Sequence, residues 1–251
     1  GGIMGHVGDA AAIHYRRLNT RKGPAVRATR TQSDMREYRR EMQELLMAVP
    51  GLVIKQGSAE RLLIEGEGSR ARVHGVVDQL GIEYRARAVV LTTGTFLRGL
   101  CHVGLRNFAG GRAGSKASVG MAEQLASLNL EMGRLKTGTT PRLDRRTIDW
   151  ESLEQQPGDV NPRRLSFYHT PPMLEQVHCA ITWTSEKTHE IIRNSLDESP
   201  MFTGVIEGVG RRYRRDRLYT SEAAVACRPG KSQNHLRTEV KVANTAVSGW
   251  S

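Results

Sequence analysis

The feature that most constrains the fold is a short, uninterrupted apolar run that leads directly into a polar turn containing glycine. Ala88–Leu91 is the run, and Thr92–Phe96 is the turn. Such a run is typical of a strand that is buried on both faces of a sheet. A glycine in the turn lets the backbone approach a nucleotide without interference from a Cβ atom. The pattern therefore predicts an α/β fold. Such a turn can bind a nucleotide, but the same pattern also occurs in α/β folds that bind no cofactor.

Apolar periodicity places further elements on both sides of this run. Residues at three- and four-residue spacing predict a long helix from Ala25 to Met47 and shorter helices at Val119–Leu128 and Thr188–Leu196. Short apolar or alternating segments predict strands, which are Leu52–Ile54, Leu62–Ile64, Val73–Val77, Ile82–Ala86 and Ala180–Thr184. Turn formers dominate 144–172, where we expect the chain to cross between domains. The fold class is thus mixed, with α/β and α+β character.

Composition excludes several classes of protein. The 251 residues are 38% hydrophobic, which is enough for a buried core. No stretch approaches the roughly 20 apolar residues of a membrane-spanning helix, so no membrane partner is expected. Cys101, Cys179 and Cys227 are far apart and form no CxxC pair, so neither a disulfide scaffold nor a cysteine-rich zinc site is expected. This usage favours a reducing cytoplasm.

The chain is strongly basic, with a formal net charge of +11. Residues 211–251 contain nine Lys or Arg and three acidic residues. A basic surplus favours a polyanionic partner such as nucleic acid, and arginine can grip phosphate with two parallel donors. Arginine enrichment also follows from the nucleotide composition of a gene, so charge alone does not decide between these readings. Little periodicity follows Ser221, which favours a solvated basic tail over a folded module.

Two segments are candidate anion sites. The Gly-Pro turn at Gly23–Pro24 precedes the expected helix, on whose first turns Arg27 and Arg30 would share one face with Lys22 nearby. Glycines flank Arg112, which suggests a backbone nest for an anion. The alternative for the first segment is structural, namely a capped helix whose arginines pair with nearby acids.

The remaining motifs give little support for a nucleotide-binding, metal-binding or catalytic site. No dinucleotide fingerprint or phosphate-binding P-loop occurs in a strand–loop–helix context. His178 and Cys179 are adjacent, but one pair cannot complete a tetrahedral metal site, so no metal is predicted. We expect Cys179 to be a small core residue.

Several strings in a fixed order resemble the MnmG/GidA family of flavoproteins that modify wobble uridines of tRNA. They are Arg17–Arg30, Val89–Leu97, Gly110–Gly114 and Gly133–Thr139, with Glu186–His189 and Gly204–Gly210 further along. The resemblance extends from residue 1 to about Tyr213. An ordered set of this length is far more specific than any single motif.

The resemblance implies part of a two-dinucleotide-binding fold, of the glutathione-reductase type, with part of an inserted domain. It implies a partial FAD-binding domain at 1–142, part of the inserted NAD or substrate domain at 143–213, and a divergent tail at 214–251. It also implies FAD as the cofactor, NADH as the reductant and methylenetetrahydrofolate as the one-carbon donor. tRNA is the implied substrate, an MnmE-type GTPase the partner, and a homodimer the assembly.

Family residues carry over at only a few positions. Those implied to lie at FAD are Ala59, Gly94, Thr95 and Ser118, while Gly210, Arg212 and Tyr213 open the family's nicotinamide segment. The family's Gly-rich fingerprint and both of its functional cysteines have no counterpart, so no catalytic residue is assigned. We therefore expect an internal, inactive part of such an enzyme. A tail translated in a shifted frame would explain the loss of pattern after Tyr213, and true divergence is the alternative.

A second functional class stays open at this point. The charge surplus and the missing cysteines also fit a non-catalytic, basic RNA-binding protein on a flavoprotein-derived scaffold. Bound flavin would separate the two classes, whereas tRNA binding is expected from both.

Overall fold

The computed structural model describes residues 2–137, 143–168 and 172–206, together with the short strands 209–210, 219–220, 223–224 and 239–243. The chain divides into two compact units. Unit 1 comprises Gly1–Ile54, Gly138–Glu186 and Tyr213–Ser251, and unit 2 comprises Lys55–Thr137 and Lys187–Arg212. Each unit is described by itself.

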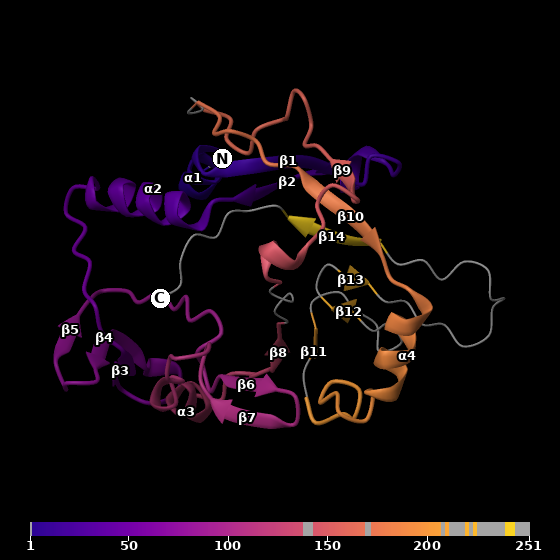
Figure 1. The fold of residues 1–251 in the computed structure, drawn as a ribbon. Coiled ribbons are helices and arrows are strands. Elements are labelled where there is room, and N and C mark those ends of the chain that lie inside the picture. Colours follow the sequence, from indigo (N-terminus) through magenta and orange to yellow (C-terminus); the bar gives the residue numbers. More distant parts are fainter. Residues whose placement is uncertain are drawn as a thin grey trace. The chain divides into compact units, whose positions relative to one another are not determined.

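Unit 1 begins with two helices beside an antiparallel hairpin (Figure 1). Helix α1 (Ile3–Ala10) leads into β1 (Ala12–Leu18), which pairs with β2 (Ala28–Ser33) from Ala12↔Ser33 to Leu18↔Ala28. The 3-10 turn η1 (Pro24–Val26) lies in the connection between the two strands. The end of α1 and the start of β1 are buried, and their apolar side chains form the core of this part of the unit.

The helix predicted for Ala25–Met47 is wrong in its first part. Helix α2 spans only Met35–Met47, and the preceding segment is β2. The apolar stripe on which the prediction rested begins at Met35, so it never supported a helix further upstream. Asp34 starts the helix, since its carboxylate accepts from the N–H of Arg36 at 2.8 Å and of Glu37 at 3.0 Å.

Unit 1 also contains a three-stranded antiparallel sheet. Its order is β14 (Glu239–Ala243), β10 (Cys179–Trp183) and β9 (Glu154–Gln156). The strand predicted near Ala180 is confirmed as β10. Before this sheet, the turn-rich segment forms the 3-10 turn η3 (Arg145–Thr147).

The predicted solvated tail needs a correction, because parts of it form paired strands. Glu239–Ala243 pairs with β10 from Trp183↔Glu239 to Cys179↔Ala243. Alternating β-branched valines at 240 and 242 suit such a strand. The short strands β12 (Tyr219–Thr220) and β13 (Ala223–Ala224) also pair with each other, and the remainder of the tail lies outside the described residues.

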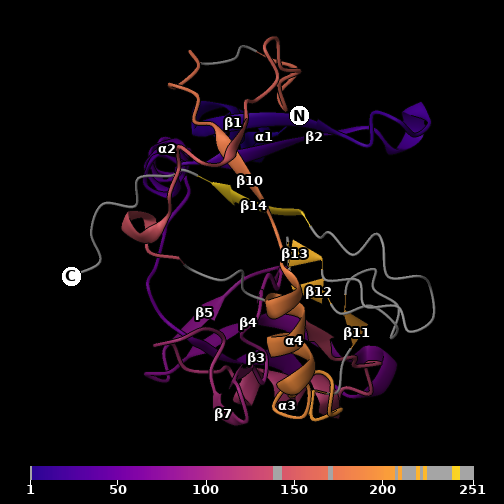
Figure 2. The same ribbon diagram turned by 45° about the vertical axis from the view of Figure 1, so that its right-hand side comes forward.

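Unit 2 is built on an antiparallel sheet with one helix packed on it. Strands β3 (Ala59–Glu65), β4 (Arg72–Asp78) and β5 (Glu83–Arg85) pair in that order, and η2 (Gly68–Arg70) connects the first two. Helix α3 (Gly120–Ser127) packs on β3 (Figure 2). Leu62, Met121 and Leu125 form the buried cluster, so the predicted strands and helix of this region are confirmed.

Two predicted strands do not form. Leu52–Ile54 has no regular structure, and its three side chains are exposed. Ala88–Leu91 is not a strand either: Val90 is 84% exposed, and only Val89 packs against the α3 cluster. A strand buried on both faces needs neighbours on each side, and the described residues supply none here.

The remaining elements of unit 2 are short. Strands β6 (Leu100–Val103) and β7 (Arg106–Ala109) form a hairpin, and β8 (Leu135–Lys136) pairs in parallel with β11 (Val209–Gly210). Helix α4 (Glu186–Asn194) confirms the helix predicted there, two residues earlier than expected. The mixed α and β fold class is confirmed. Across the described residues, no helix combines the length and apolar character of a membrane span.

Candidate functional site

Two glycine-containing loops of unit 2 pack against each other, and we call them the glycine loop pair. The first is Thr93–Gly99, and the second is Gly110–Ser118. Backbone bonds join them: Ser118 N–H donates to Phe96 O at 2.9 Å, and Gly110 N–H donates to Gly99 O at 3.0 Å. The Thr95 hydroxyl adds a bond of 2.5 Å to Gly111 O. Two turns distant in sequence thus form one rigid surface.

Close approach in the loop pair depends on Gly111. A Cβ atom at this position would overlap the ring of Phe96, so any larger residue would push the two loops apart. The aromatic ring on the first loop and the glycine on the second are therefore complementary in shape.

Gly94 serves a different purpose. Its φ is +55°, in the left-handed region that favours glycine, and no atom lies within 4 Å of the position a Cβ would take. Among the residues that the structure describes, the N–H groups of Gly94 and Thr95 have no acceptor. Consecutive free N–H groups beside open space form a nest that suits an anion such as phosphate.

The charge around the loop pair supports an anionic ligand. Residues 88–122 contain four Lys or Arg and no Asp or Glu. Arg112 is exposed, and its Nε donates to Ser115 Oγ at 3.1 Å within the second loop. Arg98, with φ +43°, and Lys116 were not singled out from the sequence, although the absence of acids over this stretch could have pointed to them.

Ser118 connects the loop pair to the sheet. It precedes α3, whose first residue, Gly120, would place a Cβ only 3.0 Å from Glu60 O. Gln124 then bonds both Leu62 N, at 2.6 Å, and Leu62 O, at 3.0 Å. These contacts bring the start of β3, where Ala59 lies, to the same end of α3 as Ser118.

The structure therefore gathers five of the predicted residues in unit 2, namely Ala59, Gly94, Thr95, Arg112 and Ser118. Gly210 pairs with Lys136 in the β8–β11 bridge of the same unit. Arg212 and Tyr213 lie outside the described residues. Binding at any of these positions remains a prediction.

The other predicted anion site has a different geometry from the one expected. Lys22 and Arg27 lie in the connection of the β1–β2 hairpin of unit 1, and Arg30 lies in β2. η1 is only three residues long and ends at Arg27, which is extended. The helical face expected to join Arg27 and Arg30 is therefore absent, because residues three apart on an extended chain point to opposite sides.

Unit 1 holds a buried polar cluster that sequence reasoning missed. The Asp9 carboxylate, which is 0% exposed, accepts from Tyr15 OH at 2.9 Å, Leu165 N–H at 2.9 Å and Ser166 N–H at 2.8 Å. Burial first, and then the hydrogen bond to Asp9, raise the pKa of Tyr15 to about 12. This Asp9 cluster ties the start of the unit to a segment more than 150 positions away. The one sequence signal for this cluster is the position of Asp9, an acidic residue directly before the apolar run 10–13.

His14 and Cys179 are also buried in unit 1. His14 Nδ1 lies 2.9 Å from Val177 O, while its Nε2 is buried without a partner among the described residues. Burial lowers the pKa of His14. Cys179 is 4% exposed, with Sγ 3.1 Å from Gln32 Oε1, as expected for a core residue. The described residues contain no cluster of three potential metal ligands.

Comparison with known proteins decides the family. The sequence profile of the family described as "Glucose inhibited division protein A", or GidA, matches residues 1–226. The chain belongs to the GidA family. The MnmG/GidA resemblance drawn from the ordered motifs is thereby confirmed, and the profile extends beyond Tyr213.

Two curated GidA-family relatives are 51% identical to the chain, and both are named "tRNA uridine 5-carboxymethylaminomethyl modification enzyme MnmG". The one from Syntrophotalea carbinolica matches over 239 residues, 95% of this chain and 37% of its own length. The one from Geobacter sulfurreducens matches over 213 residues, 85% of this chain and 33% of its own length. The chain thus spans about a third of the length of these two relatives.

Solved structures of the GidA family agree with this assignment. Aquifex aeolicus GidA in its form I crystal is similar with a TM-score of 0.73 and 41% identity, over 85% of this chain and 36% of that one. The form II crystal gives a TM-score of 0.70 and 40% identity, over 82% and 35% of the two chains. The predicted fold, part of a GidA-type flavoprotein architecture, is supported at this level.

Proposed function

We propose that this chain forms part of an FAD-dependent enzyme that adds an aminomethyl-type group to C5 of the tRNA wobble uridine. The observation that carries the proposal is the glycine loop pair, in a chain 51% identical to two tRNA uridine modification enzymes. We propose the same division as the family resemblance implies: a partial FAD-binding domain at 1–142 and part of the inserted domain at 143–213.

The loop pair fits an anionic cofactor such as FAD. The free N–H groups of Gly94 and Thr95 would bind phosphate oxygens, and Arg112 would add positive charge. Ser118 and Ala59 would line the same region. When bound, FAD supplies redox chemistry, for which NADH is the proposed reductant at a segment opened by Gly210, Arg212 and Tyr213.

The proposed partners follow from the family. They are tRNA, an MnmE-type GTPase and a second copy of the full-length enzyme, in the cytoplasm. No residue of this chain is assigned a catalytic role, and we expect the 251-residue chain by itself to form no modified uridine.

A chimeric enzyme tests the proposal. The 213-residue match in Geobacter sulfurreducens MnmG is replaced by the corresponding residues of this chain and expressed in a host that lacks its own MnmG. We expect bound flavin, measured by absorbance, and restored 5-substituted uridine, measured by mass spectrometry of tRNA nucleosides. A folded chimera that contains neither would contradict the proposal.

Two alanine variants of the chimera test the loop pair itself. Gly94→Ala places a methyl group beside the free N–H groups, and we expect it to lower the flavin content several-fold. Gly104→Ala is the matched control, since its φ is +56° and its Cβ position is equally open, but it lies in the β6–β7 turn. Equal flavin content in both variants would remove the loop pair from the FAD site.

The alternative of a non-catalytic RNA-binding protein is favoured by one observation, described below. Arg17, Arg21, Lys22 and Arg27, at the loop of the β1–β2 hairpin, are exposed and form no ion pair with another described residue. A chimera that binds tRNA but contains no flavin and forms no modified uridine would support that alternative.

A further inference from the structure

We propose that the loop end of the β1–β2 hairpin binds the phosphate backbone of RNA. The surface consists of Arg17, Arg21, Lys22 and Arg27, which we call the basic hairpin tip. The inference rests on the proposed function in one respect only, namely that tRNA is the RNA concerned. The tip belongs to unit 1, whereas the glycine loop pair belongs to unit 2.

The tip is a closed loop held by its own hydrogen bonds. Asn19 Nδ2 donates to Val26 O at 2.9 Å, Lys22 N–H donates to Asn19 O at 3.0 Å, and Arg27 Nε donates to Lys22 O at 3.3 Å. The Gly23–Pro24 turn and η1 complete it (Figure 2). A preorganised loop loses little conformational entropy when its cations bind a ligand.

The charge of the tip is not neutralised. Residues 10–33 contain six Lys or Arg and no Asp or Glu. All four tip side chains are exposed, and none of them forms an ion pair with another described residue. Asp159 accepts from the Arg17 backbone N–H at 2.8 Å rather than from its guanidinium.

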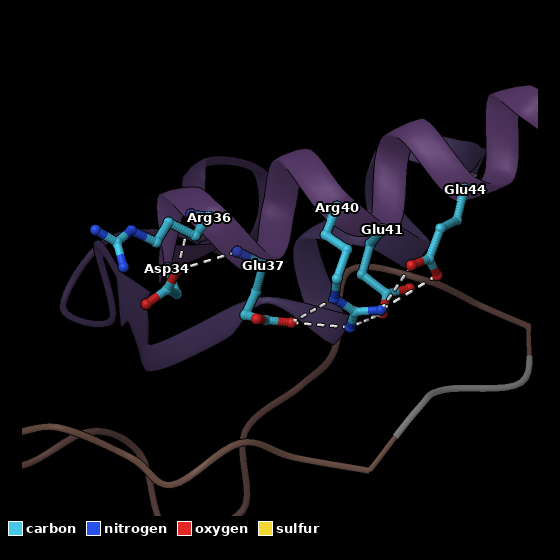
Figure 3. A network of polar contacts seen from close by, with 6 residues as sticks. All are labelled: Asp34, Arg36, Glu37, Arg40, Glu41 and Glu44. Carbon is cyan, nitrogen blue, oxygen red and sulfur yellow. Dashed lines mark hydrogen bonds and ion pairs between the residues drawn. The ribbon is translucent and has the colours of Figure 1, made fainter.

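Helix α2, in the same unit, contains an arginine whose charge is neutralised by carboxylates, and it serves as a comparison for the tip. Arg40 contacts Glu37 at 2.8 Å, Glu41 at 2.7 Å and Glu44 at 3.0 Å (Figure 3). Such an arginine has no free donor for phosphate, whereas the tip presents four cations to solvent. The tip thus groups four exposed cations in one short loop, without an ion pair to another described residue.

A polyphosphate partner fits this surface better than a membrane does. Membrane-surface segments combine cations with large apolar anchors, and Val26 is the one large apolar side chain that the loop 19–27 exposes. Three of the four cations are arginines, which bind phosphate with two parallel donors. Contacts to phosphate position a protein on RNA without reading its sequence.

Salt-dependent binding of the 251-residue chain to an unmodified tRNA transcript tests the inference. In the tip variant R17Q/R21Q/K22Q no described side-chain bond is lost, because these three side chains form none. Each lost phosphate contact lowers the slope of log K against log salt by about 0.7 to 0.9, so we expect the slope to fall by about 2. Affinity at about 50 mM salt should fall by about tenfold or more.

The matched control is R40Q/R85Q/R146Q, which changes the net charge equally. Each of these exposed arginines is ion-paired, with Glu37, Glu83 and Asp144 among its partners. We expect its slope and affinity to equal those of the unaltered chain. Equal slopes for the tip variant and the unaltered chain, or equal losses in both variants with unchanged circular dichroism, would overturn the inference.

Two further measurements separate this inference from the proposed function. A transcript with cytidine at the wobble position should bind the tip equally, since only phosphates are contacted. The chimera could form no modified uridine while the tip variant still loses tRNA affinity. In that case the proposed function is wrong, but the inference that the basic hairpin tip binds RNA is supported. The tip variant could instead lose binding to phosphatidylserine vesicles while its tRNA affinity stays equal to that of the unaltered chain. This result would identify a membrane as the partner of the tip and overturn the inference.

Discussion

Two polar clusters of unit 1 have opposite charge and opposite surroundings. In the Asp9 cluster one buried carboxylate accepts from three donors, and in the Arg40 cluster one guanidinium contacts three carboxylates. Asp9 is 0% exposed, whereas the Arg40 side chain is 51% exposed. Water replaces lost partners around Arg40 but cannot reach the donors around Asp9. The number of bonds is similar, so burial alone decides which cluster stabilises the fold.

The comparison also explains where charge is available for function. In the Arg40 cluster three carboxylates neutralise a surface cation, and the hydrogen bond that Arg40 donates to Glu37 is the main reason why the pKa of Arg40 rises. The basic hairpin tip has no such partners within the described residues. Net charge by itself would not distinguish these two arginine-rich segments.

Removal of the buried carboxylate should have the largest effect. Asp9→Ala leaves the backbone N–H groups of Leu165 and Ser166 without their acceptor, and Tyr15 OH keeps only its 3.3 Å bond to the backbone O of residue 9. We expect the free energy of unfolding to fall by about 3 kcal/mol, measured by urea denaturation. Tyr15→Phe removes one donor and keeps the two backbone bonds, so its cost should be only about 1 kcal/mol. Equal costs would mean that the cluster is not anchored through Asp9.

His14, which is buried in the same unit as Asp9, should make the free energy of unfolding sensitive to acid. Burial lowers its pKa in the folded chain, and Arg30 and Arg16 act in the same direction, opposed by Val177 O and Asp159. The unfolded chain therefore binds a proton more readily, and stability should fall as the pH drops below about 6.5, toward the lower folded pKa.

The measurement is the urea midpoint between about pH 8 and about pH 5, compared with that of His14→Phe. The variant should be less stable at high pH but should lose less stability on acidification. Parallel pH profiles for the two proteins would rule out His14 as the source of the acid sensitivity.

The start of α2 should show an intermediate effect. Asp34 is the N-cap of a helix that has no buried residue, so its two hydrogen bonds matter for helix formation. Asp34→Ala should cost about 1 kcal/mol in urea denaturation. Asp34→Ser, which keeps a capping oxygen, should recover most of this loss, and a serine variant as unstable as the alanine variant would contradict the capping role.

The smallest effect is expected at the centre of the exposed cluster. Arg40→Gln removes all the contacts shown in Figure 3 that join the three glutamates, yet these groups face solvent. We expect no resolvable change in the thermal unfolding midpoint, with or without added salt, because exposed ion pairs contribute little. A midpoint loss as large as that of Asp34→Ala would break the comparison.

Several parts of the fold could be predicted because their patterns are local. Alternation at β3 and β4, the stripe of α3 and the β10 segment depend on neighbouring residues alone. The predicted helix over Ala25–Met47 failed in its first part because the apolar stripe begins only at Met35, and residues Ala28–Ser33 pair with β1 instead. Ala88–Leu91 was predicted as buried from composition, but burial requires partner strands that the described residues lack.

The sequence by itself determined the family, since an ordered set of motifs keeps its meaning without coordinates, and it also placed glycine and arginine where an anion could bind. Only the tertiary structure decided which of these residues lie together. Gly94, Thr95, Arg112 and Ser118 meet because Phe96 packs on Gly111, and Asp9 is buried because Leu165 and Ser166 return to it. The physical reason is that a contact between distant segments depends on loop closure and packing, which no local pattern records.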